Sequence, residues 1–542
     1  MNPPAQTQKP KRRVSISNVA VLLMATSLIG QVLGLLRTKL VNANFLALGP
    51  HSTDAYFAAF NIPDFFFFTL AAGALGVAFM PILSDRLHKG DRRGMWELSS
   101  SLLNLLALIM AAVGVLIFLF AKPLVEYVVA PSMTPEQVTT TATIMRLLAF
   151  NPLLFTVSGI LTSMQQTLGR FFFFAIAPLF YNLSIIISAE LFSEVPPHHG
   201  GPWHLGIVGL GLGAIIGALL QLLVVFAGMR RVRFNWRPRI LWRSHDFHTV
   251  LRQLPPRGLD QGIDQLESII ETHFARNLGT GFVSYYNNAY TLSTAPILLI
   301  GTAISTAAFP RLNARLSQGR PDLFRKDFLR VLRAMIWITA PIVVIAFFAR
   351  AYLARLIFTA DDYHIPLILG YLVGAIFFGT LYTLLSRWFY AQKDTKTPLF
   401  VSVFIIALNI ILVYMWAKPS AYGIAGLAIA QSVVAMVQVS ILLTIMLIRD
   451  HQLFDRIFWG GCARIVSVSG FSIITGYVML SFYPLGLHDR GIVTLGGKLL
   501  LISLVVISVH IAMSALFGLD EVRPLLERLK RIITKPVQIN PF

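Results

Sequence analysis

The sequence predicts an all-α polytopic membrane protein with about fourteen transmembrane helices. Of its 542 residues, 56% are hydrophobic and only 13% are charged, and the mean hydropathy is +0.69. Soluble domains carry about 25% charged residues, so this composition excludes the soluble globular class. The net charge of +20 would suit a nucleic-acid-binding protein. The basic residues, however, lie in short loops between apolar segments, which indicates contact with membrane lipids and no nucleic acid partner.

A transmembrane helix needs about 20 mainly apolar residues, and successive segments of the chain meet this requirement. The expected helices lie near residues 17–36, 55–83, 98–120, 140–165, 172–193, 205–229, 258–280, 284–310, 332–349, 366–391, 397–417, 423–447, 460–482 and 496–517. The single cysteine, Cys462, excludes a disulfide framework. No cleavable signal peptide is expected, because the first apolar run is longer than a signal core and lacks a cleavage site.

The loop charges predict the orientation. Basic loops at 85–93, 230–243, 311–326 and 387–396 alternate with loops poor in basic residues, such as 194–203, which contains no Lys or Arg. Since Lys and Arg are retained on the cytoplasmic side, this alternation predicts an N-terminus inside the cell. The C-terminal tail is also basic, so both termini are expected in the cytoplasm, which requires an even number of helices.

An internal repeat predicts two lobes. The segment 206–211 (GIVGLG) matches 423–428 (GIAGLA), 78–83 (AFMPIL) matches 308–312 (AFPRL), and Asn182 pairs with Asn409. Offsets of roughly 215–230 residues favour two parallel six-helix lobes followed by two further helices. The expected organisation is a basic cytoplasmic N-terminus at 1–16, an N-lobe at 17–235, a cytoplasmic linker at 236–257, a C-lobe at 258–450, two helices within 451–518 and a basic cytoplasmic tail at 519–542.

The seventh segment carries an acidic stripe, with carboxylates spaced i, i+4, i+7 and i+11 on one helix face: Asp260, Asp264, Glu267 and Glu271. A carboxylate in hydrocarbon costs about 2.5–3.5 kcal/mol on insertion scales. The stripe is therefore expected to face a wet cavity and to bind a proton or a sodium ion that couples transport to the membrane potential. The alternatives are salt bridges to Arg257, His273 or Arg276, or an interfacial position of the segment.

Several motifs carry a resemblance to a known family. They are 53–63 (TDAYFAAFNIP), 73–81 (GALGVAFMP), 217–223 (GALLQLL), and 390–398 (YAQKDTKTP) with Asn409 beyond it. Together they resemble the MurJ (MviN) family of the multidrug/oligosaccharidyl-lipid/polysaccharide (MOP) exporter superfamily. The resemblance implies a flippase that moves lipid II, the undecaprenyl-pyrophosphate-linked peptidoglycan precursor, to the outer leaflet of a bacterial cytoplasmic membrane by alternating access. It also implies a role in cell wall biogenesis and cell shape, with cell-wall synthesis enzymes as partners.

Three stretches depart from the family pattern. In 30–38 (GQVLGLLRT), Arg37 keeps the second arginine of the family's first helix, but Gln31 replaces the first and Thr38 replaces an aspartate. The stretches 67–74 (FFTLAAGA) and 289–292 (AYTL) lack the family's other arginines and its acidic residues. Guanidinium groups bind pyrophosphate through bidentate, permanently charged donors. The resemblance implies that the family's arginines form a cluster that holds the pyrophosphate, and this chain lacks most of that arginine cluster.

The expected site residues fall into two sets. The expected substrate-binding residues are Arg37, Lys39, Gln31, Asp54, Asn287 and Asn288, and the expected cation-coupling residues are Glu271, Glu267, Asp264, Asp260 and Asn409. The resemblance implies that Glu271 stands where relatives can carry a sodium-binding aspartate. Structural alternatives stay open: interfacial charges at a helix end for Arg37 and Lys39, a helix N-cap for Asp54, and turn residues for the two asparagines.

No catalytic motif, metal-ligand spacing or phosphate-binding loop occurs in the sequence, so we expect a transporter without a cofactor rather than an enzyme. Two alternatives to a lipid II flippase remain. One is a MOP-superfamily antiporter for drugs or another lipid-linked glycan. The other is a non-transporting cell-wall scaffold, which the lost arginines favour and the acidic stripe argues against.

Overall fold

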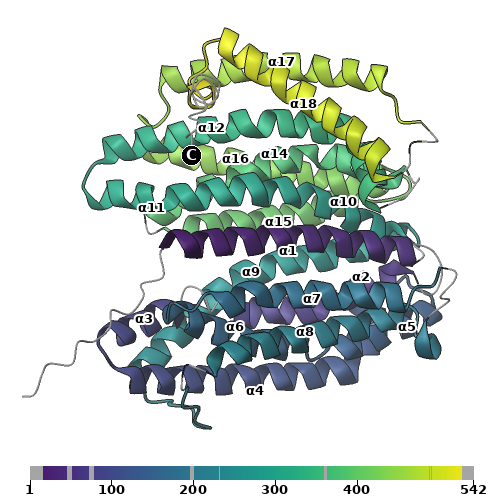
Figure 1. Cartoon of the computed structure of the whole chain (residues 1–542), viewed down its shortest axis with the longest axis vertical. Coiled ribbons are helices and arrows are strands. Elements are labelled where there is room, and N and C mark those ends of the chain that lie inside the picture. Colours follow the sequence, from purple (N-terminus) through teal and green to yellow (C-terminus); the bar gives the residue numbers. More distant parts are fainter. Residues whose placement is uncertain are drawn as a thin grey trace, which may run out of the picture. The chain divides into compact units, whose positions relative to one another are not determined.

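The computed structural model consists of helices joined by short loops, and the residues it describes contain no strand (Figure 1). The described residues are 16–45, 52–72, 79–195, 201–230, 232, 234–358, 363–392, 394–486, 489 and 491–527. Within the helices some side chains fall outside the description, among them those of Asp260, Asp264 and Arg257.

The chain divides into two compact units, of which the first comprises residues 1–45, 62–124 and 139–262. Its described elements are α1 (Ile16–Asn44), the end of α2 (Thr53–Phe67), the π-helical η1 (Phe68–Ala72), α3 (Met80–His88), α4 (Arg92–Leu124), most of α5 (Pro135–Leu148), α6 (Asn151–Thr167), α7 (Phe172–Leu191), η4 (Pro202–His204), α8 (Ile207–Met229) and the start of α9 (His245–Leu278). Figure 1 shows α7 lying beside α8, and α6 packs against both α4 and α8.

Glycines permit close helix contacts in the first unit. A Cβ on Gly213 of α8 would lie 2.1 Å from Ser188 Oγ of α7. In α9, a Cβ on Gly258 would lie 1.8 Å from the Thr69 carbonyl oxygen of η1, and one on Gly262 would lie 2.3 Å from Thr69 Oγ1. Gly258 and Gly262 thus form a G-x-x-x-G pair, which lets a membrane helix approach a neighbouring backbone closely.

The second unit comprises residues 46–61, 125–138 and 263–542. Its described elements are the start of α2, the π-helical η3 (Val125–Val129), the rest of α9, α10 (Phe282–Pro296), the π-helical η5 (Ile297–Thr302), α11 (Ala303–Ser317), α12 (Pro321–Phe348), α13 (Arg350–Phe358), α14 (His364–Ala391), α15 (Lys396–Trp416), α16 (Ile424–Arg449), α17 (Arg456–Phe482) and α18 (Ile492–Leu516). The apolar helix α14 is central, because it packs against α10, α12 and α16.

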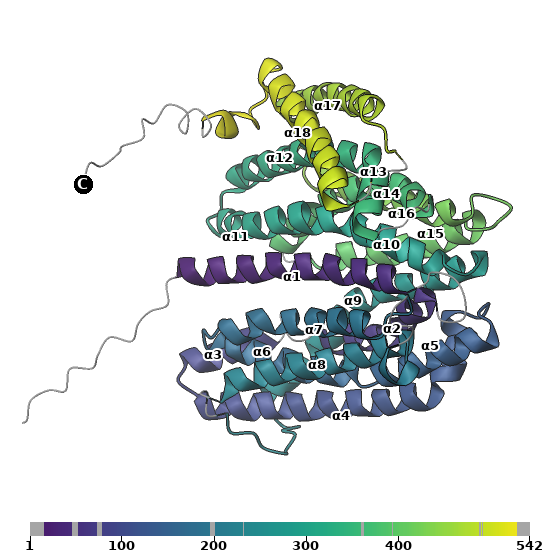
Figure 2. The ribbon, with the colours of Figure 1, turned by 45° about the vertical axis from the view of Figure 1, so that its right-hand side comes forward.

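The last two helices belong to this second unit. Both α17 and α18 pack against α12 and against each other (Figure 2). Trp337 of α12 donates its indole N–H to Ser514 Oγ of α18 at 2.8 Å. Arg333, one turn before Trp337, is ion-paired with Glu521 at 2.5 Å. The extra helices are therefore anchored at α12 by polar contacts as well as by apolar packing.

The internal repeat is visible in backbone geometry. Gly206 and Gly423 both precede a helix with positive φ, at (49°, −130°) and (56°, −135°). Such values favour glycine. The interrupted helices also correspond: Phe282 follows Thr53 by 229 residues, and the π segment at Ile297 follows the one at Phe68 by the same number. The two halves thus repeat the same helix breaks as well as the same motifs.

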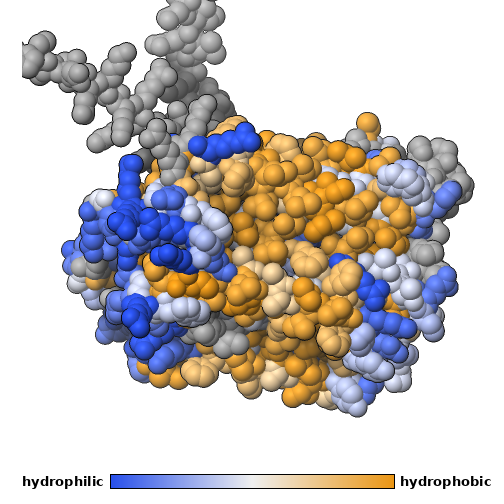
Figure 3. All heavy atoms as spheres, turned by 90° about the horizontal axis from the view of Figure 1, so that it is seen from below, coloured by the Kyte–Doolittle hydropathy of each residue, from blue (hydrophilic) through white to orange (hydrophobic). Residues whose placement is uncertain are grey.

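Wherever the structure describes them, the predicted segments fall on helices, which confirms the fold class; residues 73–78 of the predicted segment 55–83 lie outside the described residues. Eleven described helical runs are long and apolar enough to cross a membrane. The remaining predicted segments correspond to α1, to α2 with α3, and to α9, so the count of fourteen spans stays a prediction. On the face drawn in Figure 3, apolar side chains form a broad area with hydrophilic side chains on either side, as expected for a surface in contact with lipid.

The unit boundaries differ from the predicted lobes in two respects. The predicted linker at 236–257 is partly helical, because α9 begins at His245 and runs without interruption to Leu278. In addition, residues 46–61 and 125–138 group with the second unit rather than with the rest of the N-lobe. Polar contacts with α9 and α10 explain the grouping.

Candidate functional site

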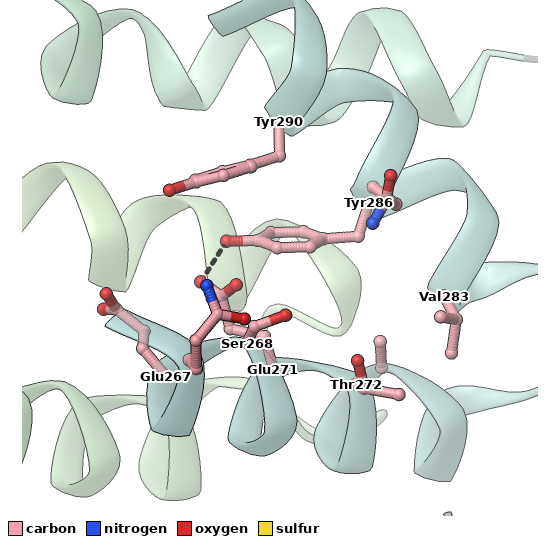
Figure 4. Close-up of a pocket in the computed structure, with 10 residues that line it drawn as sticks. Glu267, Ser268, Glu271, Thr272, Val283, Tyr286 and Tyr290 are labelled. Carbon is pink, nitrogen blue, oxygen red and sulfur yellow. Dashed lines mark hydrogen bonds between the residues drawn. The ribbon is translucent and has the colours of Figure 1, made fainter. Parts of the chain in front are cut away.

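The main candidate site is a polar pocket of about 190 Å³ between α9 and α10. Figure 4 shows Glu267, Ser268, Glu271 and Thr272 of α9 opposite Tyr286 and Tyr290 of α10. The helical spacing of Val283, Tyr286, Asn287 and Tyr290 (i, i+3, i+4, i+7) puts these side chains on one face of α10, directed to α9. Two predicted cation-coupling residues, Glu267 and Glu271, therefore line one cavity, together with the predicted substrate-binding residue Asn287.

Glu271 is buried, with only 7% of its surface exposed. Tyr286 donates its phenolic O–H to Glu271 Oε1 at 2.5 Å, and the ring of Tyr290 stacks over that of Tyr286 at 6.2 Å (Figure 4). A carboxylate held in apolar surroundings is stable only when it is hydrogen-bonded, protonated or paired with a cation. The hydrogen bond from Tyr286 meets the first of these conditions for Glu271.

Glu267 joins this pocket to α15. Asn409 of α15 donates its Nδ2 amide to Glu267 Oε1 and contacts Gln431 Oε1 at 3.4 Å. Asn409 is 2% exposed, and its Oδ1 has no hydrogen-bond partner among the described residues. Two carboxylates one helical turn apart, with an unpaired amide oxygen beside them, are hard oxygen donors of the kind that bind protons and small cations.

Among the residues that the structure describes, no three His, Cys, Asp or Glu side chains come together in a way that could hold a metal ion. The pocket thus offers two carboxylates and neutral oxygens rather than a dense metal cluster. The binding of a proton or a sodium ion at these oxygens stays a prediction.

Asp54 lies in a second polar cluster and is fully buried. Its carboxylate accepts hydrogen bonds from the Gly281 and Ser284 amides at 2.6 and 2.8 Å and from Ser284 Oγ at 2.7 Å. Gly281 precedes α10 with a φ of +93°, and Ser284 is its third residue. Asp54 therefore acts as an N-cap, but for α10 instead of for its own helix α2.

Arg276 completes this cluster at the end of α9. Its Nη1 donates to Thr280 Oγ1 at 2.8 Å and lies 4.0 Å from Asp54 Oδ2, and its Nη2 donates to Gln137 of α5. Nearby, Asn61 of α2 donates to Thr272 Oγ1 at 2.8 Å and accepts from Ser268 Oγ at 3.2 Å. These bonds tie α2 and the beginning of α5 to α9 and α10. Arg276 belongs to the Asp54 cluster, whereas Asn61 bonds to two residues that line the acidic pocket.

The other predicted residues are dispersed. Gln31, Arg37 and Lys39 lie in the second half of α1, with Gln31 exposed and the other two half-buried. Asn288 is buried in α10 at 1% exposure. The side chains of Asp260 and Asp264 lie outside the described residues, so their membership of the stripe stays a prediction.

Several residues of these clusters were not predicted. Tyr286 and Asn61 occupy ordinary helical positions, and only the identity of their partners on α9 marks them. Asp64, which follows Pro63 in α2, interacts electrostatically with Arg37 of α1. An acidic residue inside this apolar segment was a signal that the sequence offered.

The 390–398 motif also has a structural explanation. Asp394 Oδ1 accepts the amides of Lys396 and Thr397, both at 3.0 Å, at the start of α15. Its Oδ2 accepts Thr397 Oγ1 at 2.6 Å and Arg449 Nη1 of α16 at 2.7 Å. Partial burial acts to raise the pKa of Asp394, but the Thr397 and Arg449 donors outweigh it and hold the pKa at about 2. The motif thus fastens the α14–α15 loop to the end of α16.

Comparisons with known proteins agree on one family. A family profile described as "Lipid II flippase MurJ" matches residues 46–488. The "Probable lipid II flippase MurJ" of Vibrio cholerae is 27% identical over 442 residues, covering 78% of this chain and 81% of the relative. That of Rhizobium tropici is 23% identical over 513 residues, covering 92% and 94%.

Solved structures show the same fold. A structure described as "Lipid II flippase MurJ, inward closed conformation" matches with a TM-score of 0.76 and 21% identity, covering 93% of this chain and all of that one. An inward-facing multidrug resistance MATE family transporter of the MOP superfamily matches with a TM-score of 0.64 and 15% identity, covering 83% and 98%.

Proposed function

Because the chain belongs to the lipid II flippase MurJ family, we propose that it moves lipid II from the inner to the outer leaflet by alternating access. It is a multi-pass transporter of the bacterial inner membrane and not an enzyme. The family match across residues 46–488 carries this proposal. Peptidoglycan synthesis outside the membrane depends on such a step, because a charged saccharide headgroup cannot cross hydrocarbon unaided.

The pocket between α9 and α10 is the proposed coupling site. Glu267 and Glu271 bind a proton or a sodium ion there, with Asn409 and Tyr286 orienting the carboxylates. Binding of one cation removes the repulsion between the buried carboxylate of Glu271 and the half-buried one of Glu267, which changes the stability of the α9–α10 contact. A cation that enters from one side and leaves on the other would drive the transport cycle with the membrane potential.

The Asp54 cluster is the proposed closure at the outer ends of α2, α5, α9 and α10. The basic-loop pattern predicts that these ends face away from the cytoplasm and that both termini face it. Opening toward the outside would require breaking the bonds of Asp54 to Gly281 and Ser284. When the transporter opens to the outside, the buried hydrogen bonds of Asp54 are replaced by contacts with water and substrate.

Arg37 is the proposed contact for the pyrophosphate of the substrate. Arg37 is half-buried in α1, and its guanidinium would offer a phosphate group a bidentate donor.

The direct test is replacement of a cell's own conditional MurJ by this chain, with survival and lipid II exposure at the outer leaflet as measurements. Survival together with lipid II exposure is the expected result. Failure of a correctly inserted, full-length protein to support either one would contradict the proposal. The Glu97→Gln variant is a matched control for later carboxylate changes, because Glu97 of α4 pairs with Arg93 and Arg237, outside the pocket.

A further inference from the structure

A second cavity lies apart from the acidic pocket, in the groove between α11 and α12. These two helices are joined by a short connection at 318–320 and lie side by side in Figures 1 and 2. The groove holds about 340 Å³. Ile304 and Ala308 of α11 and Val331 of α12 contribute to its apolar wall, and Arg311, Asp327 and Arg330 lie at one end of it.

The charged end of the groove is strongly basic. Asp327 is nearly buried, and Arg311 binds its carboxylate with two parallel hydrogen bonds of 2.9 and 2.8 Å. Arg315 adds a third bond of 3.1 Å, while Arg330 lies 3.8 Å away, beyond hydrogen-bond distance. Three arginines thus surround one carboxylate. The side chains of Arg311 and Arg330 are 59% and 64% exposed, so their positive charge is accessible from outside.

The apolar part of the groove is long enough to contact the upper part of a lipid's acyl chain. From Ile304 to Arg311 the helix rises by roughly 10 Å at 1.5 Å per residue. The exposed side chains of Arg311 and Arg330 make the groove accessible from outside the helices, and the basic loop 311–326 predicts that its charged end lies at the cytoplasmic leaflet. Basic pockets between membrane helices on this side bind anionic lipid headgroups.

We propose that the α11–α12 groove binds one anionic phospholipid of the cytoplasmic leaflet, with its phosphate at Arg311 and Arg330 and an acyl chain along Ile304 and Ala308. A zwitterionic lipid offers the same chain without the net charge, and a free phosphate offers the charge without the chain. The combination of both features in one groove selects a molecule that has both. This binding does not depend on the flippase activity or on the acidic pocket.

The test is lipid retention by the full-length purified protein, measured by native mass spectrometry during titration with phosphatidylglycerol. We expect one equivalent to bind, and we expect Arg330→Gln to weaken binding by at least about fivefold, since one basic residue near a headgroup contributes about that much. Ala308→Leu, which fills the groove, should weaken it also. Arg330 contributes no hydrogen bond to Asp327, so this variant is expected to fold, and thermal unfolding checks that it does.

Arg320→Gln is the matched control, because Arg320 is exposed in the same loop but pairs with Asp322 outside the groove. Equal binding by all variants would overturn the proposal. If phosphatidylethanolamine binds as tightly as phosphatidylglycerol, the proposed role of the arginines is wrong. If inorganic phosphate competes as strongly as a phospholipid does, the proposed role of the apolar groove is wrong. Stoichiometric displacement by lipid II, at a site that Arg330→Gln weakens, would assign the groove to the transported substrate instead.

Discussion

At the scale of single residues, the acidic pocket depends on charge. Glu271→Gln keeps the size of the side chain and an acceptor for Tyr286 but removes the charge. One charge moved across the membrane field is worth about 2.3 kcal/mol per 100 mV, which is roughly 50-fold in an equilibrium between two conformations. We expect Glu271→Gln to lose the dependence of lipid II exposure on membrane potential, measured with and without an ionophore.

Glu97→Gln should retain the full dependence, because it lies outside the pocket. If Glu271→Gln keeps both activity and its response to the ionophore, the pocket is structural and coupling occurs elsewhere.

Arg37 tests the binding of the headgroup. Arg37→Ala removes the only arginine that this helix retains from the family pattern and should abolish complementation of a MurJ-depleted cell. Arg37→Lys should rescue growth only in part, because an ammonium group cannot reproduce the bidentate guanidinium contact. Normal growth with Arg37→Ala would mean that the pyrophosphate is held by other residues.

A substitution of Asp54 tests the proposed closure at the outer ends of α2, α5, α9 and α10. Asp54→Asn retains one acceptor oxygen but replaces the other with an amide group that cannot accept the Gly281 or Ser284 hydrogens. Leaving a buried donor unpaired costs about 1–3 kcal/mol, so the variant should unfold at a lower temperature in detergent than wild type does. The exposed pair of Asp85 with Lys89 makes Asp85→Asn the control, for which little change is expected. An unchanged melting temperature for Asp54→Asn would remove the closure argument.

At the scale of elements, the α14–α15 loop is held by a carboxylate with a depressed pKa. Because the folded-state pKa of Asp394 is about 2 and its ordinary value is 3.8, the ionised carboxylate stabilises the fold fully above about pH 4. That contribution is lost as the pH falls toward 2. Asp394→Asn should therefore melt below wild type at pH 7, and the difference should shrink between pH 4 and pH 2.5. A difference that is constant with pH would contradict this role of the charge.

The interrupted helices show what the sequence could and could not predict at this scale. Apolar runs located the long described helices, since length and composition determine whether a segment can span lipid, but they missed the short helix α13. The repeat was also found, because Gly206 and Gly423 need the same positive φ and so remain glycine. By contrast, no simple feature of the amino-acid composition marks the π segments at Phe68 and Ile297. The first turns of α9 were missed because these residues are too polar to be recognised as part of a membrane-spanning segment.

Positions on one helix face were easier to predict than contacts between distant parts of the chain. Glu267 and Glu271 line one pocket, as their spacing on α9 predicted, while their binding of a cation stays a prediction. The partners of Asp54 were not predicted, since Gly281 and Ser284 are 227 and 230 residues away. The Tyr286 hydroxyl and the Asn61 amide were missed for the same reason, because their function depends on which helix packs opposite.

At the scale of the whole molecule, the predicted topology can be tested by labelling single cysteines in a Cys462→Ser background. A cysteine at Trp203, which is 78% exposed, should react with an impermeant reagent added outside the cell. A cysteine at Trp242, which is 54% exposed, should react only after the membrane is opened. The reverse pattern would invert the assignment of both termini to the cytoplasm.

The uninterrupted helix α9 has a mechanical consequence. Within the second unit, Glu271 of the acidic pocket and Arg276 of the Asp54 cluster lie on the same stretch of α9, about 7.5 Å apart along its axis. A continuous helix transmits displacement along its length without relays of side chains that switch between two arrangements. Events at the carboxylates can thus reach the Asp54 cluster through α9 itself. Substitutions on the outer face of this stretch should therefore leave the transmission intact, whereas a proline between Glu271 and Arg276 should break it while sparing both residues.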